Sequence, residues 1–211
     1  GYFADVTQPC NKRLPGSGCP AIEGEHHNHA ILGASGHCVA THPSDMGVPL
    51  AAFDAVVTYE TADGRGESPL ADLYLPVGDT PHIETALPPG ALITGVVLPP
   101  APVAAHSRYR KVRERASYAF AIGSIAAALD VRGGVVHEVR LAFGAVASRP
   151  WRARAAERVL TGAPADAATF AAAADAELAA AEPLPHNGYK VTLMRNLVVA
   201  VLSELTEEAT R

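Results

Sequence analysis

The stretch Asp130-Val131-Arg132-Gly133-Gly134-Val135-Val136 decides the fold of the second half of the chain. Two consecutive glycines between apolar segments are typical of a two-residue β-hairpin, because that turn needs a positive φ at both central positions. Residues 130–132 and 135–147 are therefore expected to pair as antiparallel strands, and residues 107–112 form a further predicted strand.

Helices are predicted on both sides of this hairpin. The small residues over 118–129 predict a helix that can pack closely on a sheet. Residues 151–160 predict another helix, because Pro150 suits the first helical position and Gly162 suits the end. Two more helices follow in the last part of the chain.

The last two predicted helices set the fold class. Asp166 is placed to cap an alanine-rich helix over residues 167–181. Residues 189–205 form a long amphipathic pattern with Leu193 and Leu197 on one side. Helices that surround a hairpin favour an α+β fold, in which helices pack on a small antiparallel sheet.

A proline-rich segment divides the chain. Pro99-Pro100-Ala101-Pro102 fixes φ and removes backbone donors, so no regular element is expected to cross it. We therefore predict a boundary near residue 103, with one part over residues 1–103 and an α+β part over residues 104–211.

The first part is expected to begin with loops over residues 1–44. A helix over residues 46–52 and a strand over residues 55–59 are predicted to follow. Asp63-Gly64 is a hairpin turn signal. Residues 92–98 form an apolar run between prolines, which predicts a buried strand.

Composition narrows the class of protein. The chain has 211 residues, a net charge of −5 and 48% hydrophobic residues. That hydrophobic content excludes a disordered tail, and mild acidity without a dense Lys/Arg block argues against nucleic acid as the main partner. No apolar run reaches the roughly 18 residues of a membrane span. Because Gly1 is not preceded by an initiator methionine or a signal peptide, we expect a truncated or processed fragment.

All three cysteines, Cys10, Cys19 and Cys38, lie in the first fifth of the chain. Their odd number excludes a complete disulfide framework, and the glycines and prolines around them predict loops. Such loops offer backbone N–H groups to anionic sulfurs, which suits an iron–sulfur cluster. The spacing matches neither zinc-ribbon pairs nor the ferredoxin pattern. Small buried thiols or one adventitious disulfide therefore remain the alternative.

Histidines gather in the same region. One of them could complete a Cys3His zinc site, although we expect His26 and His27 to be solvated loop residues. His29 precedes an apolar segment and is a candidate core residue or a residue beside the metal ligands. The five are His26, His27, His29, His37 and His42.

Familiar catalytic motifs are absent from the sequence. It contains no GxGxxG, Walker A, GxSxG or HExxH pattern. Asp45, next to Ser44 and near His42, suggests either an acid–base group or an ordinary helix N-cap, and the cap is favoured on physical grounds.

Three blocks carry a resemblance to a known family. They are Pro9-Cys10-Asn11-Lys12-Arg13, then Cys38-Val39-Ala40-Thr41-His42-Pro43-Ser44-Asp45-Met46, and Tyr109-Arg110-Lys111-Val112-Arg113-Glu114-Arg115-Ala116-Ser117-Tyr118-Ala119. The sequence resembles the FAD-binding (medium) subunits of bacterial molybdenum hydroxylases, the xanthine dehydrogenase and carbon monoxide dehydrogenase superfamily. It is most similar to the periplasmic-type aldehyde oxidoreductases, whose FAD subunit carries an extra [4Fe–4S] cluster.

The resemblance implies a fold and a set of site residues. Residues 1–103 would be the second half of a PCMH-type FAD-binding domain with an iron–sulfur loop over about 1–44, and residues 104–211 the C-terminal domain. Cys10, Cys19 and Cys38 would ligate the cluster, with the fourth cysteine expected just before Gly1. The flavin contacts would come from Asp45 with its neighbour Ser44, which meet the ribityl chain, from Ile93 on the isoalloxazine ring, and from Lys111 near its carbonyl edge.

The resemblance also implies an electron-transfer function. A large subunit would oxidise the substrate at a molybdenum cofactor, and a small subunit with two [2Fe–2S] clusters would relay electrons. The FAD of this subunit would pass them to an external acceptor. The expected partners are these two subunits and the N-terminal FAD subdomain, in the bacterial cytoplasm or periplasm. The alternative is a non-enzymatic interaction module stabilised by zinc or an iron–sulfur cluster.

Overall fold

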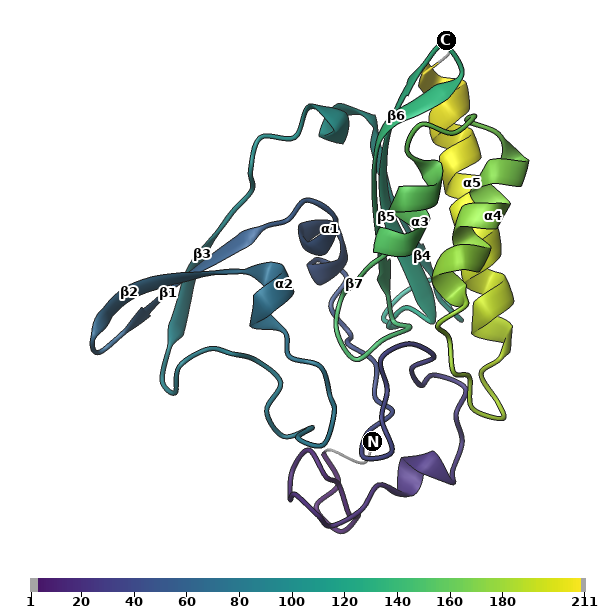
Figure 1. Ribbon diagram of the computed structural model, residues 1–211. Helices are drawn as coiled ribbons and strands as arrows, with labels where there is room; N and C mark the ends of the chain where they lie inside the picture. Colours follow the sequence, from purple (N-terminus) through teal and green to yellow (C-terminus); the bar gives the residue numbers. More distant parts are fainter. Residues whose placement is uncertain (1–3, 210–211) are drawn as a thin grey trace.

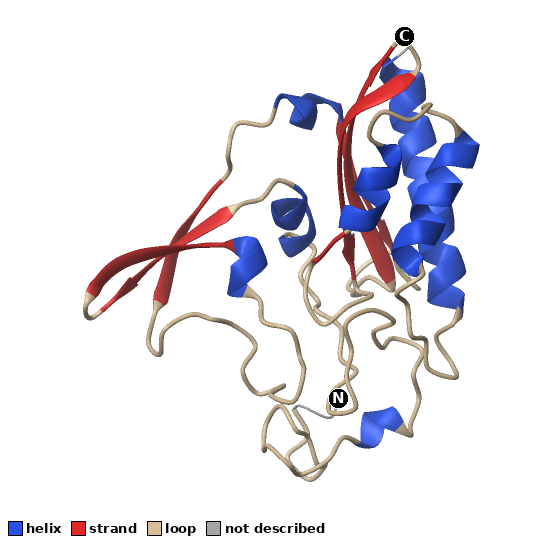
Figure 2. Ribbon diagram, viewed as in Figure 1, coloured by secondary structure: helices blue, strands red, loops and turns tan. Residues whose placement is uncertain are grey.

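The computed structural model describes residues 4–209, which form two antiparallel sheets with helices packed around the larger one (Figure 1). Figure 2 shows that the N-terminal segment is mostly loop and that its first part lies at one end of the molecule. Its regular structure before residue 47 is the short 3-10 helix Pro20–Ile22. This arrangement confirms the predicted α+β class. Within residues 4–209, no helix has the length and apolar character needed to cross a membrane.

The larger sheet is built around the predicted hairpin. Its turn glycines have positive φ, 57° at Gly133 and 78° at Gly134, and Arg132 pairs with Val135 across the turn. The strand predicted over residues 107–112 is confirmed as the neighbour of the hairpin. The strands, in their order across the sheet, are β4 (Ser107–Val112), β5 (Gly123–Arg132), β6 (Val135–Gly144) and β7 (Trp151–Arg152).

The prediction of a helix over residues 118–129 is wrong. Residues 123–129 are the first part of β5, and every residue in this stretch is buried. One face of the strand packs against the C-terminal helices and the other against helix α1 (Gly47–Ala52). Because a run of small residues buried on both faces has no hydrophobic period, its pattern does not distinguish a strand from a helix.

Helices cover one face of this sheet (Figure 1). The helix predicted over residues 151–160 begins later than expected, because Trp151 and Arg152 pair with β6 as strand β7. The predicted cap is confirmed, since Asp166 Oδ1 accepts a hydrogen bond from Thr169 N at 2.8 Å. The three helices are α3 (Arg154–Leu160), α4 (Ala167–Leu178) and α5 (Tyr189–Ala209).

The two faces of the larger sheet are packed differently. The face toward α4 and α5 carries large side chains such as Ile125, Leu141 and Phe143, which are completely buried. The opposite face carries small residues, so α1 packs very close to the sheet. A Cβ atom added to Gly144 would lie only 2.5 Å from Val48 Cγ2 of α1.

The smaller sheet has the order β2-β1-β3. The predicted hairpin at Asp63-Gly64 is confirmed, and a four-residue helix, α2, follows its second strand. The apolar segment 92–98 does form a strand, but the expectation that it is buried is wrong. Leu92, Val97 and Leu98 are each more than half exposed. The elements are β1 (Val56–Thr61), β2 (Gly64–Pro69), β3 (Leu92–Val97) and α2 (Leu70–Leu73), and a 3-10 helix (Pro102–His106) leads on to β4.

The N-terminal loop region is fixed through residues 30–32 to the segment that follows strand β6 of the larger sheet. The backbone N–H groups of Ile31 and Leu32 both donate to Val146 O, at 2.8 and 3.0 Å. The fully buried Lys190 of α5 adds two contacts, because its ammonium donates to His29 O and Ala145 O. This segment therefore belongs to the core of the second half of the chain, although it lies far away in sequence.

Candidate functional site

The residues before helix α1 place a carboxylate beside strand β4. Ser44 Oγ accepts a hydrogen bond from the backbone N–H of Gly47 at 3.0 Å, which supports the first turn of α1. The side chain of Asp45 makes no bond to that turn and points to β4 instead. The N-cap position of α1 is Met46, which has no side-chain cap, so the cap predicted for this pair is wrong. The carboxylate of Asp45 remains available for other partners.

Asp45 is held by two side chains of β4. Its Oδ2 atom lies 2.6 Å from Lys111 Nζ, and its Oδ1 atom accepts a hydrogen bond from Tyr109 Oη at 2.9 Å. The carboxylate is nearly half exposed, whereas the Lys111 side chain is 20% exposed. The structure therefore brings together Asp45 and Lys111, two of the four residues expected at the flavin.

Strand alternation explains this cluster. Tyr109 and Lys111 are two residues apart, so they share a face of β4. Arg108 and Arg110 point the other way, and both donate to Glu204 of α5, at 2.8 and 2.5 Å. Arg110 and Lys111 therefore lie on opposite faces of β4. Tyr109 was missed from the sequence, although the same two-residue spacing from Lys111 would have indicated it.

The electrostatics of the cluster favour a neutral tyrosine. Burial raises the pKa of Tyr109 to about 12, and the neighbouring Asp45 carboxylate contributes in the same direction. Tyr109 therefore remains a hydrogen-bond donor to Asp45 throughout the physiological pH range. The cluster offers one carboxylate, one ammonium group and one phenol on the same surface.

Ile93 lies on the other sheet. It is the second residue of β3, is 49% exposed, and pairs with Tyr59 of β1. Within residues 4–209 it belongs to none of the buried apolar clusters. The structure therefore does not join Ile93 to the Asp45–Lys111 pair, and its role at a flavin stays a prediction.

The three cysteines are free thiols in the N-terminal loops. Cys10 and Cys38 are buried and Cys19 is half-buried. Burial raises the pKa of the Cys38 thiol, and Cys19 and Cys10 make smaller contributions in the same direction, whereas a hydrogen bond from the Ala40 backbone and the charge of Lys12 oppose them. No disulfide joins these three cysteines.

Asn11 connects the loop of Cys10 and Cys19 with the loop of Cys38. Its Oδ1 atom accepts a hydrogen bond from Gly18 N at 2.8 Å, and its Nδ2 atom donates to His37 O at 2.9 Å. Cys10 N also donates to Ser17 Oγ at 3.0 Å. These bonds connect the loops that carry the three cysteines into one loop cluster.

The donor chemistry of this loop cluster fits an iron–sulfur centre, because thiols and backbone N–H groups are what such centres use. The positions of the side chains do not by themselves form a metal site. Within the described range 4–209, no group of three or more His, Cys, Asp or Glu side chains is close enough to hold a metal ion. The expected fourth cysteine before Gly1 lies outside the described residues. Ligation by Cys10, Cys19 and Cys38 therefore remains a proposal.

The histidines of the N-terminal loops differ in burial and in their contacts. His26 is 3% exposed and its Nε2 atom lies 2.7 Å from Ile22 O, so the expectation that it is solvated is wrong. His27 is an exposed loop residue, as expected, and its Nε2 atom lies 2.6 Å from Glu114 Oε1. Burial lowers the pKa of His29, and His26 and Lys190 contribute to the shift.

Two family models match consecutive parts of the chain. Residues 27–101 match the FAD binding domain in molybdopterin dehydrogenase. Residues 101–205 match the CO dehydrogenase flavoprotein C-terminal domain. The first match includes Asp45 and Ile93, and the second includes Lys111. Both models describe flavoproteins, which favours the flavin subunit over the interaction module weighed above.

Curated relatives point the same way. The chain is 49% identical over 209 residues to the aldehyde oxidoreductase FAD-binding subunit PaoB of Escherichia coli, covering 99% of this chain and 62% of the relative. It is 29% identical over 119 residues to the glyceraldehyde dehydrogenase medium chain of Sulfolobus acidocaldarius, covering 56% of this chain and 40% of the relative. The chain therefore spans less than two thirds of the length of either relative.

Solved structures have the same fold. Quinoline 2-oxidoreductase from Pseudomonas putida matches with a TM-score of 0.67 and 24% identity, over 87% of this chain and 60% of that one. Carbon monoxide dehydrogenase from Hydrogenophaga pseudoflava matches with a TM-score of 0.65 and 26% identity, over 76% of this chain and 55% of that one. The two family models, which together match residues 27–205, and the 49% identity to PaoB show that the chain belongs to the family of FAD-binding subunits of molybdenum hydroxylases.

Proposed function

We propose that the chain is part of an FAD-binding electron-transfer subunit of a molybdenum hydroxylase of the aldehyde oxidoreductase and xanthine dehydrogenase type. The observation that carries the proposal is the Asp45–Lys111 pair, which joins two expected flavin residues within a chain that matches flavoprotein models from residue 27 to 205. When bound, FAD would accept electrons and release them to an external acceptor.

Asp45 has the hydrogen-bonding capacity that a ribityl chain requires. A carboxylate can accept about four hydrogen bonds, and Asp45 uses one on Tyr109 and one on Lys111. The remaining capacity faces a partly exposed surface and suits neighbouring hydroxyl groups. Tyr109 and Lys111 fix the position of the carboxylate, so it can act as an acceptor without moving.

Lys111 supplies positive charge at the same place. Its ammonium group has three donors, and one is used by Asp45. The other two N–H donors are proposed to face the carbonyl edge of the flavin ring. The exposed apolar side chain of Ile93 on β3 offers a surface on which a flat ring could pack.

We further propose that Cys10, Cys19 and Cys38 hold a [4Fe–4S] cluster together with a fourth cysteine expected just before Gly1. Three thiols in one loop cluster, linked through Asn11, support this assignment. Electrons would come from the [2Fe–2S] clusters of a small subunit, after substrate oxidation at the molybdenum cofactor of a large subunit. No side chain of this chain is proposed to touch the organic substrate.

Replacement of Asp45 tests the flavin assignment. Asp45→Asn removes the negative charge and exchanges one acceptor oxygen for a donor, so the FAD content of the purified native complex should fall several-fold. The measurement is flavin fluorescence after denaturation, normalised to protein. The matched control is Asp63→Asn in the exposed β1–β2 turn, which should retain its FAD. Full FAD occupancy in Asp45→Asn would contradict the proposed role.

A further inference from the structure

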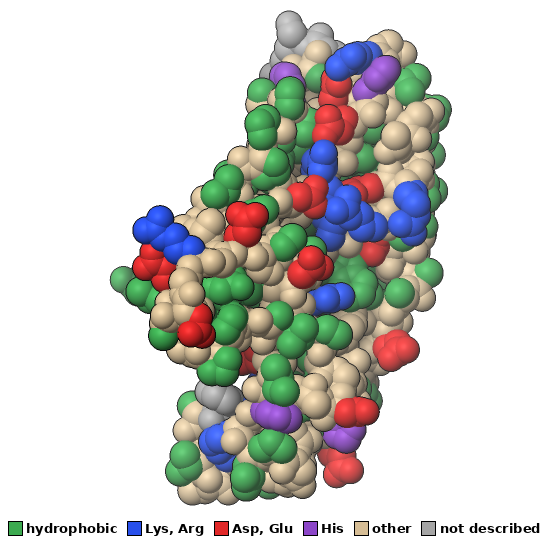
Figure 3. All heavy atoms as spheres, turned by 60° about the vertical axis from the view of Figure 1, so that its left-hand side comes forward, with side chains coloured by type: hydrophobic (Ala, Val, Ile, Leu, Met, Phe, Trp, Pro, Cys, Tyr) green, Lys and Arg blue, Asp and Glu red, His purple; other side chains and the backbone are tan. Residues whose placement is uncertain are grey.

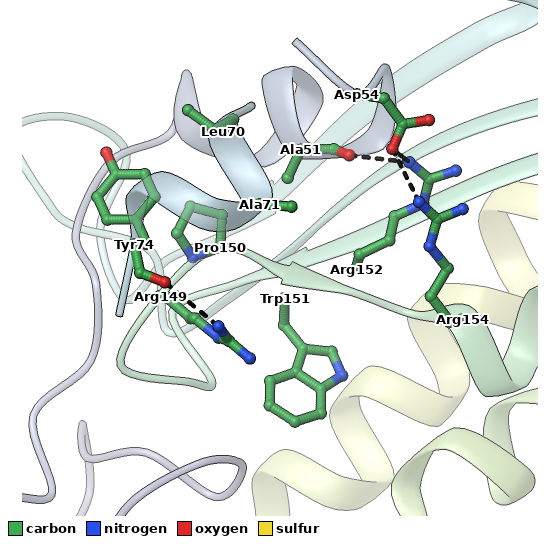
Figure 4. Close-up of a pocket in the computed structure, with 10 residues that line it drawn as sticks. All are labelled: Ala51, Asp54, Leu70, Ala71, Tyr74, Arg149, Pro150, Trp151, Arg152 and Arg154. Carbon is green, nitrogen blue, oxygen red and sulfur yellow. Dashed lines mark hydrogen bonds and ion pairs between the residues drawn. The ribbon is translucent and has the colours of Figure 1, made fainter. Parts of the chain in front are cut away.

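A cavity lies at the β7 edge of the larger sheet, whereas Lys111 lies on β4 at the other edge. The cavity has a volume of about 260 Å³ and opens between α2 and strand β7 (Figure 4). Strands β4 and β7 are the two opposite edges of the sheet. Three strand spacings, about 14 Å in total, therefore separate Lys111 on β4 from the β7 side of the cavity.

The cavity has an apolar side and a charged side. Figure 4 shows Leu70, Ala51 and Ala71 above the opening and Trp151 below it, with Asp54, Arg152 and Arg154 at one end. Arg149 lies at the other end, next to Trp151. A ligand inside would therefore meet apolar walls and a guanidinium group.

The arginines at the charged end already have acidic partners. Arg152 and Arg154 donate to Asp54 Oδ1 at 2.9 and 2.8 Å, and Arg140 donates to Asp54 Oδ2 at 2.5 Å. Glu157 provides a second carboxylate for Arg152 and Arg154. Figure 3 shows basic and acidic side chains side by side on the face of the molecule toward the smaller sheet.

Arg149 differs from these arginines. Its Nη1 atom donates to the backbone oxygen of Tyr74 at 3.2 Å, and within the described residues no carboxylate forms an ion pair with it. The side chain is half-buried. A half-buried guanidinium group with a single hydrogen bond to an uncharged carbonyl retains donors for an anion.

Trp151 gives the cavity a fixed wall. Its indole Nε1 donates to Glu177 Oε1 of α4 at 2.8 Å, so the polar edge of the ring is turned toward the helix. The other side of the ring rests on Gly33, where an added Cβ atom would lie 3.1 Å from Trp151 Cζ3. The ring is therefore held from two directions, and its position does not depend on a ligand.

We propose that this cavity binds a small organic acid with an apolar body, whose carboxylate pairs with Arg149. Guanidinium and carboxylate groups match in shape and form two parallel hydrogen bonds. The apolar walls of Leu70, Pro150 and Trp151 accept a ring or a short aliphatic chain. The volume suits a ligand smaller than a typical drug molecule, and a single-ring acid such as benzoate is an appropriate probe.

The test compares benzoate with its neutral analogue benzamide in the purified native complex, using isothermal titration calorimetry. We expect benzoate to bind, and benzamide to bind at least about tenfold more weakly, because the contact with Arg149 requires a charge. Arg149→Gln should weaken benzoate binding by a similar factor. The control is Arg158→Gln, the same change at an exposed position of α3 outside this cavity, which should bind benzoate like the wild type.

A second readout separates this cavity from the flavin. Benzoate should leave the visible absorption spectrum of the flavin unchanged, because the cavity lies at the opposite edge of the sheet. A shifted flavin spectrum, equal binding of benzamide, or unchanged benzoate binding in Arg149→Gln would each overturn the proposal. So would the absence of benzoate binding to the wild-type complex.

Discussion

At the scale of single residues, Lys111 is the group whose charge should matter most for FAD. Reduction increases the negative charge at the carbonyl edge of the flavin ring, and a nearby ammonium group stabilises that charge. Asp45 lies 2.6 Å from Lys111 Nζ and offsets part of this effect. An interaction of about 1.4 kcal/mol corresponds to about 30 mV for a two-electron couple.

We therefore expect Lys111→Met to lower the flavin midpoint potential by some tens of millivolts. Arg110→Met is the matched control, because Arg110 lies on the opposite face of β4 and is bound to Glu204. The measurement is a spectroelectrochemical titration of the native complex for both variants. An unchanged midpoint in Lys111→Met, or a larger shift in Arg110→Met, would show that the wrong residue has been assigned to the flavin.

Lys190 is a buried cation that no sequence pattern indicated. Its side chain is fully buried, and burial lowers its pKa to about 8 from the ordinary 10.5. Because the unfolded chain binds this proton more tightly, stability should rise as the pH increases from about 8 toward 10.5. Below about pH 8 the group is charged in both states, and the cost of burying the charge is fully present.

Lys190→Met removes this titration together with two hydrogen bonds. Urea titrations at about pH 7 and about pH 9.5 should show that the stability advantage of the wild type over the variant grows by about 2 kcal/mol. Other titrating groups cancel in the difference when they are independent of Lys190. A difference that stays constant with pH would show that Lys190 keeps its ordinary pKa in the folded chain.

At the scale of elements, the close packing of α1 on the larger sheet positions Asp45. Gly144→Ala would place a Cβ atom 2.4 Å from Ser124 Oγ and 2.5 Å from Val48 Cγ2, so α1 must move. Overpacking of this kind costs typically 1–3 kcal/mol. We expect a lower thermal midpoint and reduced FAD content. Gly188→Ala is the control, because a Cβ atom there meets no atom within 4 Å and should have little effect.

Elements with a specific signal were predicted well. The turn at Gly133-Gly134, the Asp166 cap and the long amphipathic helix each have a local signature, and the structure has all three. The first part of β5, residues 123–129, was missed because its alanines carry no period when both faces are buried. Strand β7 is only two residues long, and pairing with β6 rather than local sequence defines it.

The candidate site was predicted residue by residue, but its contacts were not. The pairing of Asp45 with Lys111 depends on which face of β4 meets α1, and this is a property of the tertiary fold. The buried contacts of Lys190 with residues 29 and 145 join segments far apart in sequence, so no local pattern could indicate them. The exposed apolar face of β3 was likewise unexpected, because sequence alone gives hydrophobicity but not burial.

At the scale of the whole molecule, the cysteine loops are attached to the core unevenly. Residues 30–32 are fixed to the larger sheet through Val146, and Glu182 N also donates to Ile31 O at 2.8 Å. The loop of Cys10 and Cys19 is linked to the Cys38 loop through Asn11. A cluster bound by all three cysteines would add a further cross-link between these loops.

Loss of that cross-link should therefore have a local effect. Because metal binding and folding are coupled, Cys10→Ser, Cys19→Ser and Cys38→Ser should each lose iron and acid-labile sulfide, which should be close to four per subunit in the wild type for a four-iron cluster. In hydrogen exchange, amides of residues 10–24 should lose protection, whereas Ile31 and Leu32 should keep theirs through Val146.

Leu14→Ala, an exposed change in the same loop, is the control. Stoichiometric zinc without sulfide, or unchanged protection of residues 10–24 in Cys10→Ser, would show that these thiols do not hold an iron–sulfur cluster.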